Sequence, residues 1–135
     1  MVQKIQDIPW IEKHRPVNIS EIYTQNNIKQ VLESCIQNNN LPNLLLYGPP
    51  GTGKTSTITA MCRQLFGPIL MKNRILILNA SDDRGINIVR EKIKQFANMT
   101  IGNGDLNYPS PHFKVIILDE ADNMTIDAQS ALRRI

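Results

Sequence analysis

The chain has 135 residues, which is enough for one domain with a hydrophobic core and too few for two. Hydrophobic residues make up 41% and charged residues 20% of the composition, which excludes the disordered, collagen-like and disulfide-rich classes. Fifteen basic residues against 12 acidic ones give a formal net charge of +3, which permits a nucleic-acid partner without requiring one.

The two cysteines, Cys35 and Cys62, are far apart and no histidines cluster near them. We therefore expect free thiols in a reducing compartment, and neither a disulfide framework nor a zinc site. The N-terminal residues alternate between polar and apolar types, and the apolar runs of the chain are strand-sized. Nothing in this pattern indicates secretion or membrane insertion.

The first elements in chain order are an arm, a helix and a strand. Pro9 and Pro16 bias the preceding residues toward extended backbone, so we interpret residues 1–17 as an arm. Apolar residues at helical spacing over 28–36 predict a helix, and the asparagines at 38–40 end it. The apolar run at 44–47 stops at a Gly/Pro-rich loop, which is typical of a buried strand.

The strand-and-helix pattern then repeats. Apolar positions from Ile58 to Leu65 predict a helix that stops at Gly67 and Pro68. The run at 75–78 predicts a second buried strand, and Ile86, Val89, Ile93 and Phe96 lie at helical spacing behind it.

The last third of the chain holds a long connection, a strand and a helix. A polar connection over 99–112 leads to a third apolar run at 115–118, and Thr125 is a candidate N-cap for a final helix carrying Ile126, Leu132 and Ile135. Strands that are apolar on both faces, alternating with amphipathic helices, predict an α/β fold with a parallel sheet and helices on both faces. Because no stop signal follows Arg133, we expect the natural protein to continue.

The loop at residues 48–55 reads Gly-Pro-Pro-Gly-Thr-Gly-Lys-Thr and fits G-x-x-x-x-G-K-[ST] between a predicted strand and helix. Its glycines let backbone N–H groups surround phosphate oxygens at a helix N-terminus. Lys54 would reach the β- and γ-phosphates and the Thr55 hydroxyl would bind Mg²⁺. The alternative, a turn that fits the pattern by chance, is weakened by the flanking elements. The predicted nucleotide-binding residues of this P-loop are Gly48, Pro49, Pro50, Gly51, Thr52, Gly53, Lys54, Thr55 and Ser56.

Two carboxylates, Asp119 and Glu120, directly follow the third apolar run. A phosphate-bound Mg²⁺ needs a carboxylate near it, a role that suits Asp119, and Glu120 would polarise the attacking water as general base. Two solvated acids in a loop are the alternative, which the P-loop makes less favoured. For Asp122 we favour a charge at a helix terminus.

Two further groups are open to more than one interpretation. Arg90 and Lys94 lie one helical turn apart and would meet phosphates or simply form a solvated face. Trp10, with Arg15 and Pro16, would cover a nucleotide base or pack against the core.

Four separated blocks also carry a family resemblance. They are Trp-Ile-Glu-Lys-His-Arg-Pro at 10–16, the strand and P-loop at 44–55, Asn-Ala-Ser-Asp-Asp-Arg-Gly at 79–85, and Leu-Asp-Glu-Ala-Asp at 118–122. In these blocks the chain resembles the small subunits of replication factor C, the clamp loaders among the AAA+ ATPases. Residues 41–43 and 65–68 are most similar to the subgroup that contains the human subunit numbered four. His14 and Ile77 depart from the family pattern, outside the phosphate chemistry.

The resemblance implies a function and its residues. It implies ATP at the P-loop, adenine against Arg15, Pro16 and Val17, and Mg²⁺ held by Thr55 and Asp119. It implies hydrolysis chemistry at Lys54, Asp119 and Glu120, and contacts with the DNA backbone from Arg84, Arg90 and Lys94. The implied partners are the other subunits of a nuclear hetero-pentamer, the sliding clamp (proliferating cell nuclear antigen) and primer-template DNA, without a membrane.

The resemblance also implies that much of the family's domain is missing. Residues 1–17 match the arm, and residues 18–135 match an AAA+ core truncated after the helix that follows Glu120. Family members continue with a sensor strand, an arginine finger, a helical lid and a collar. Because that strand lies between the P-loop strand and the Asp119 strand, we expect a nucleotide binder with little turnover and no clamp loading.

The same motifs argue against several other functions. Another AAA+ ATPase, such as a helicase loader or branch-migration motor, would not need the blocks at 10–16 and 79–85. A small P-loop kinase would be expected to lack the Asp119–Glu120 pair, and a GTPase would show an Asn-Lys-x-Asp loop, which this sequence does not contain. A scaffold that never hydrolyses would be indicated by loss of Glu120, which is present.

Overall fold

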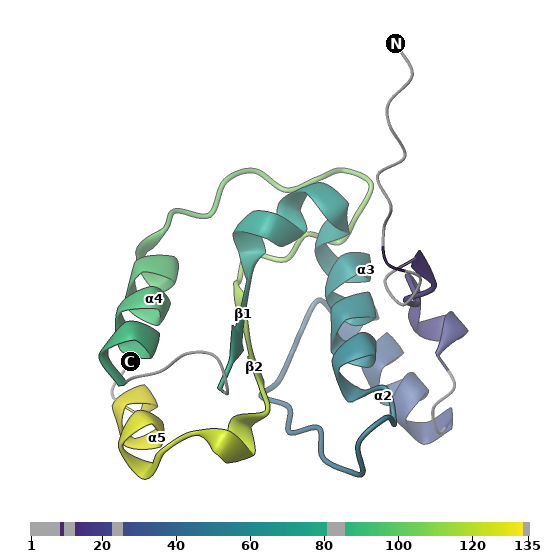
Figure 1. Cartoon of the computed structure of the whole chain (residues 1–135). Coiled ribbons are helices and arrows are strands. Elements are labelled where there is room, and N and C mark those ends of the chain that lie inside the picture. The colour runs from purple at the N-terminus through teal and green to yellow at the C-terminus, as the bar shows by residue number, and fades with distance from the viewer. Residues whose placement is uncertain (1–8, 10–12, 23–25, 81–85, 134–135) are drawn as a thin grey trace. The chain divides into compact units, whose positions relative to one another are not determined.

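The computed structural model describes residues 9, 13–22, 26–80 and 86–133 (Figure 1). Its elements in chain order are η1 (Ile19–Glu21), α2 (Asn26–Gln37), α3 (Lys54–Arg74), β1 (Ile75–Asn79), α4 (Ile86–Asn98), β2 (Val115–Asp119), η2 (Ala121–Asn123) and α5 (Ile126–Leu132). The chain divides into two compact units, residues 1–64 and 65–135, and α3 begins in the first and ends in the second.

In the first unit, η1 and α2 contact each other, and Lys29 Nζ donates a hydrogen bond of 3.1 Å to the Ser20 carbonyl. The helix predicted over 28–36 is confirmed by α2. The buried face of α2 is narrower than the spacing of its apolar residues predicted. Leu32 is buried, whereas Val31 is exposed. Ile19 and Leu32 are buried here, and so are Ala60, Met61 and Cys62 of α3.

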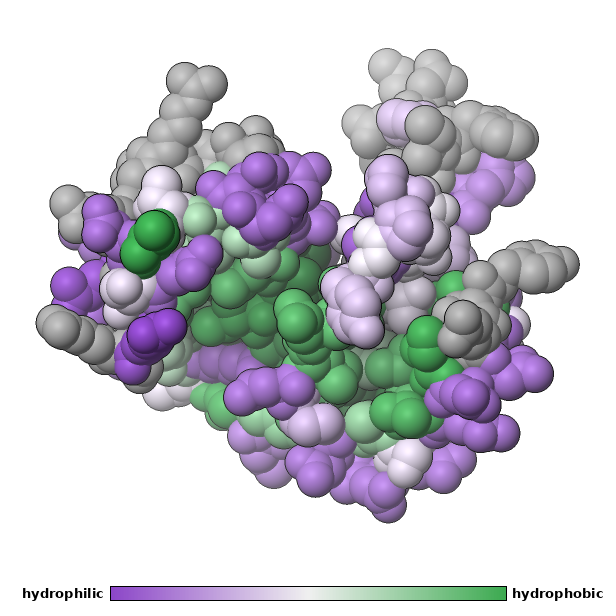
Figure 2. Space-filling view, turned by 90° about the horizontal axis from the view of Figure 1, so that it is seen from below, coloured by the Kyte–Doolittle hydropathy of each residue, from purple (hydrophilic) through white to green (hydrophobic). Residues whose placement is uncertain are grey.

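The prediction of a buried strand at residues 44–47 is wrong for this structure. Residues 41–47 have no regular secondary structure, and Leu45 and Tyr47 are 82% and 88% exposed. A strand needs a neighbour to pair with its backbone N–H and C=O groups, and the described residues of the first unit contain no other strand. The side chains of Leu45 and Tyr47 consequently remain on the surface. Figure 2 shows one face of the molecule, on which hydrophobic residues are exposed among hydrophilic ones.

The predicted stop at Gly67 and Pro68 is confirmed as a break inside α3. Gly67 has φ 71° and ψ 167°, which no helix adopts, and the chain re-enters a helix at Pro68, a residue suited to a first helical turn. A Cβ atom at Gly67 would lie 2.5 Å from the ring of Tyr108, so the close approach of this ring also requires glycine. The helix then continues to Arg74, beyond the predicted stop.

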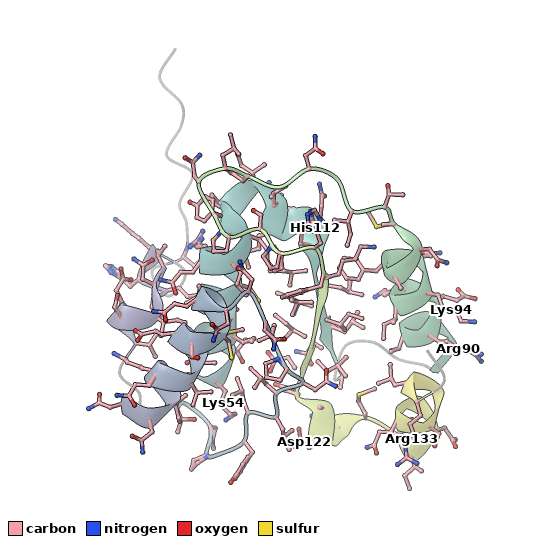
Figure 3. All side chains as sticks on the ribbon, turned by 180° about the vertical axis from the view of Figure 1, so that it is seen from behind. Lys54, Arg90, Lys94, His112, Asp122 and Arg133 are labelled. Atoms are coloured by element: carbon pink, nitrogen blue, oxygen red, sulfur yellow. The ribbon has the colours of Figure 1, made fainter. Side chains whose placement is uncertain are left out.

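The second unit contains the parallel sheet. β1 and β2 pair in parallel from Ile75 with Val115 to Asn79 with Asp119. Figures 1 and 3 show α4 and α5 on one side of these strands. Leu78 of β1 packs with Val89 and Ile93 of α4, and this cluster is flanked by Leu76, Leu118, Met124 and Leu132. The predicted α/β class with a parallel sheet is therefore confirmed.

The predicted final helix is confirmed by α5. α5 begins at Ile126, directly after Thr125, as the capping pattern indicated. Leu132, the last residue of α5, packs against the cluster of β1 and α4, whereas Ile126, its first residue, is exposed. Ile135 lies outside the described residues.

Two further observations concern the cysteines and the length and apolarity of the helices. Both cysteines are free, and burial raises the pKa of the Cys62 thiol to about 12, so this thiol stays protonated and unreactive near neutral pH. Within the described ranges, no helix has the length and apolarity that crossing a bilayer requires.

Candidate nucleotide-binding site

The P-loop joins the exposed segment 41–47 to the first turn of α3. Gly48, Gly51 and Gly53 have φ of 147°, 77° and 84°, values at which a side chain is strained. A Cβ atom added at Gly51 or Gly53 would meet nothing within 4 Å, so these two positions face open space. The glycines are therefore required by the curve of the backbone, and no neighbouring atom crowds the loop at Gly51 or Gly53.

Lys54 lies over this loop. Its ammonium group donates hydrogen bonds of 3.0 Å to the Gly48 carbonyl and 2.9 Å to the Pro49 carbonyl (Figure 3). The Thr52 hydroxyl donates a third bond of 2.9 Å to the same Pro49 oxygen. These bonds fix the curvature of the loop and hold a positive charge at its opening, where an anion would bind.

The start of α3 has the geometry of a helix N-terminal anion site. The Gly53 carbonyl accepts bonds of 2.8 Å from both the backbone N–H and the hydroxyl of Thr57, so the first helical turn closes on the loop. Early N–H groups of a helix have no partner inside the helix, and the helix dipole favours negative charge there. With Lys54 and the open glycines, this donor set fits a polyphosphate.

The second predicted group lies at the end of β2. Asp119 is half-buried and its carbonyl accepts a hydrogen bond of 3.0 Å from Ala80, which ties the ends of the two strands together. Asp119 Oδ1 accepts a bond of 3.1 Å from the Glu120 N–H. Glu120 is exposed and has the left-handed values φ 51° and ψ 41°, which are uncommon outside glycine and asparagine.

The chemistry of these oxygen atoms suits Mg²⁺. Hydroxyl and carboxylate oxygens such as those of Thr55 and Asp119 are hard ligands, and Mg²⁺ is commonly held by one or two of them together with phosphates and waters. The described residues contain no cluster of three or more His, Cys, Asp or Glu that would bind a metal without such help. Asp122 lies in η2, is exposed, and does not belong to the carboxylate pair of Asp119 and Glu120.

The described part of the arm includes the three residues predicted to cover adenine. Arg15 and Pro16 are half-buried, and Val17 is exposed. The Val17 N–H donates a bond of 2.9 Å to Glu21 Oε2, and Asn18 Nδ2 donates one of 3.1 Å to Glu21 Oε1. The bond from Val17 is the main cause that lowers the pKa of Glu21 below its ordinary value. The sequence signal for this contact is Asn-x-x-Glu at residues 18–21, a helix-capping pattern that is not among the predicted site residues.

The remaining predicted residues lie on α4 or outside the described residues. Arg90 and Lys94 are exposed on α4, while Val89 and Ile93 of the same helix are buried, and Figure 3 shows both cations leaving the helix on its outer side. Arg84 and Trp10 lie outside the described residues. The structure thus gathers the P-loop residues in the first unit and Asp119 with Glu120 in the second.

The chain is similar to known ATPases. The family described as "ATPase family associated with various cellular activities (AAA)" matches residues 44–134. Replication factor C subunit 2 of Saccharomyces cerevisiae is 58% identical over 98% of this chain and 38% of the relative. Replication factor C subunit 4 of Arabidopsis thaliana is 56% identical over 93% and 38%, and that of Homo sapiens is 54% identical over 98% and 37%.

These matches cover the P-loop, both strands and the carboxylate pair, although the chain spans only about 38% of the length of the curated relatives it matches. The relatives include replication factor C subunits numbered 2, 3 and 4, so the subgroup expected from residues 41–43 and 65–68 stays a prediction. The chain belongs to the AAA family of ATPases and, within it, is a relative of the replication factor C subunits.

Proposed function

We propose that this chain is the ATP-binding part of a clamp-loader subunit that places a sliding clamp on primer-template DNA. The observation that carries the proposal is the P-loop, whose glycines leave open space and whose lysine lies over its opening. The similarity to replication factor C subunits supports the assignment to clamp loading. Another DNA-associated AAA+ ATPase is the alternative from the same family.

Each residue of the P-loop has a defined part in holding ATP. The N–H groups of Gly48, Gly51, Thr52 and Gly53 would donate hydrogen bonds to phosphate oxygens, and the Lys54 ammonium group would leave the two loop carbonyls to bind the β- and γ-phosphates. Ser56 follows in the first turn of α3, where the helix dipole also favours the phosphates. Arg15, Pro16 and Val17 would form the surface against which adenine packs.

Hydrolysis is assigned to the carboxylate pair. Mg²⁺ bound with ATP would supply charge neutralisation at the phosphates, with the Thr55 hydroxyl and the Asp119 carboxylate as its protein contacts. Glu120 would accept a proton from the attacking water as general base. The left-handed backbone conformation of Glu120 sets the direction in which its side chain leaves the main chain.

The DNA contacts are assigned to exposed cations of the second unit. Arg90 and Lys94 would bind the duplex backbone, and Arg84 would join them in the same role. The other replication factor C subunits and the sliding clamp are the proposed protein partners, in a nuclear hetero-pentamer.

The DNA contacts are tested by replacing Arg90 and Lys94 with Gln. The change should weaken binding to every duplex sequence, and the slope of log affinity against log salt concentration should fall in magnitude by about 1 for each lost phosphate contact. A charge-neutral pair of surface changes, Asn38→Gln and Gln37→Asn, serves as the control.

The nucleotide proposal is tested with the single tryptophan, Trp10. Mg-ATP and Mg-GTP are titrated against its fluorescence in the wild-type chain, in Lys54→Ala, and in Lys72→Ala, which removes an exposed lysine at the other end of the same helix. We expect saturable, ATP-selective quenching in the wild type and Lys72→Ala and its loss in Lys54→Ala. An equal response of all three proteins would contradict the P-loop assignment.

A further inference from the structure

The polar residue Arg74 is buried at the junction of α3 and β1. It is 2% exposed and directly precedes Ile75, the first residue of β1. Its guanidinium donates hydrogen bonds of 2.8 Å to the Gly102 carbonyl and 3.3 Å to the Pro111 carbonyl. A buried arginine is costly unless its donors are paired, so these two contacts indicate a specific role.

The residues that Arg74 holds belong to the long connection between α4 and β2. This connection has no regular secondary structure, yet it is anchored at several points along its length. The Ser110 N–H donates a bond of 2.8 Å to the Leu65 carbonyl, and Phe66 and Phe113 pack edge to face with ring centres 5.9 Å apart. Lys114 Nζ binds the carbonyls of Phe96, Ala97 and Met99 at the end of α4.

The anchoring matters because the strands themselves do not select their pairing. β1 begins Ile-Leu-Ile-Leu and β2 begins Val-Ile-Ile-Leu, so both faces of each strand are apolar. Register is set by the hydrophobic pattern and by the connection between the strands, and a pattern that is apolar on both faces does not distinguish one register from the next. A slip of one residue would move every side chain of β2, including that of Asp119, to the opposite face of the sheet.

We propose that Arg74 is a positioning residue that sets the register of β2 against β1 and thereby the place of Asp119 and Glu120. It joins the residue before β1 to Pro111, four positions ahead of Val115, so it fixes both strands where their first residues pair. The effect is transmitted along five in-register pairs to Asn79 and Asp119. This inference rests on the proposed function insofar as Asp119 is taken as the Mg²⁺ contact.

The test compares Arg74→Gln and Arg74→Lys with Lys72→Gln, an exposed cation two residues earlier in the same helix. The affinity of the full 135-residue chain for ATP is measured with Mg²⁺ and with a chelator, by calorimetry. Hydrogen exchange of the amides over 115–120 is measured in the chain without nucleotide. The first readout reports on the Mg²⁺ contact, and the second reports on β2 whether or not ATP binds.

We expect Arg74→Gln to weaken Mg-ATP binding about tenfold, as loss of a supporting residue around a metal ligand does, without weakening metal-free ATP binding. Arg74→Lys, which keeps the charge but loses the paired geometry, should lie between wild type and Arg74→Gln. Exchange over 115–120 should be faster in Arg74→Gln, while Lys72→Gln should match the wild type in both readouts.

Three results would overturn the inference. The first is Mg-ATP affinity of Arg74→Gln equal to that of the wild type with unchanged exchange over 115–120. The second is an equal loss of Mg-ATP and metal-free ATP binding in both variants, because that indicates a general structural role. The third is an unfolded circular dichroism spectrum in both variants. If Mg²⁺ does not raise the affinity of the wild type, the proposed role of Asp119 fails, and exchange alone decides the register.

Discussion

Two apolar runs of this chain have similar sequences and different structures. Residues 44–47 (Leu-Leu-Leu-Tyr) and the β2 run at 115–118 (Val-Ile-Ile-Leu) were both predicted to be buried strands. β2 pairs with β1, and its Val115 and Ile117 are buried. Leu45 and Tyr47 of the first run are almost fully exposed.

The comparison shows that an apolar run indicates a tendency to form a strand, whereas the presence of a neighbouring strand decides whether the strand forms. β2 finds β1 because an anchored connection brings it there. Residues 44–47 have no such neighbour among the described residues of their unit. A lone strand leaves its backbone groups to water and gains nothing from burying one face.

The largest expected effect separates the two runs directly. Ile117→Ala should lower the free energy of unfolding by about 2–4 kcal/mol, because it removes buried methyl groups and leaves a cavity. Leu45→Ala should change it by no more than about 0.5 kcal/mol, because the side chain is exposed. Urea unfolding followed by circular dichroism measures both. Similar losses in the two variants would mean that residues 44–47 are buried after all.

A smaller loss of stability is expected from a change at Gly67, where α3 is broken and the Tyr108 ring lies close to the backbone. Gly67→Ala forces a side chain into φ 71° and against the Tyr108 ring, so we expect a loss of about 1–3 kcal/mol in the same assay. Gly102→Ala is the matched control, because a Cβ atom there meets nothing within 4 Å. Equal stability of the two variants would argue against the close contact between Gly67 and Tyr108.

The anchor before β2 should contribute less. Lys114→Gln removes a cation that binds the last carbonyls of α4 and lies 5.3 Å from the Phe96 ring centre. Interaction of a cation with the helix C-terminus contributes about 0.3–1 kcal/mol, and we expect a loss of about 1 kcal/mol. Lys72→Gln, at an exposed position, should leave the unfolding curve unchanged. A larger loss from Lys72→Gln would contradict the assignment of Lys114 as the anchor.

The smallest expected effect lies in the first unit and depends on pH. Because the native state lowers the pKa of Glu21 from 4.5, the bond to Val17 stabilises the native state above that pH. The stabilisation is lost as the pH falls below 4.5 through the lowered pKa. The amide shift of Val17 should therefore move below pH 4.5 in the wild type and stay constant in Glu21→Gln. A shift that persists in the variant would assign the titration to another group.

Much of this fold could be predicted because its signals are local. The helical spacing of Val89, Ile93 and Phe96, the break at Gly67 and the short strands at 75–78 and 115–118 all appear in the structure. The strand at 44–47 could not be judged, because pairing depends on residues distant in the sequence. The packing of Leu132 against the cluster of β1 and α4 likewise depends on residues distant in the sequence.

The candidate site likewise has one part that the local sequence predicted and another part that it did not. The P-loop follows from eight consecutive residues, so its spacing alone predicted the loop and the helix start at Lys54. The positioning contacts of Arg74 and Lys114 were missed, because each joins residues far apart in sequence. No local pattern marks a buried arginine whose partners are carbonyl groups 28 and 37 positions away.

The most direct test of the account follows the backbone amides of the P-loop by nuclear magnetic resonance while Mg-ATP is added. The account predicts saturable shifts at Gly51, Gly53, Lys54 and Thr55 in the wild type and in Lys72→Ala, and none in Lys54→Ala. Saturable binding whose shifts lie elsewhere in the chain, or that survives Lys54→Ala unchanged, would contradict it.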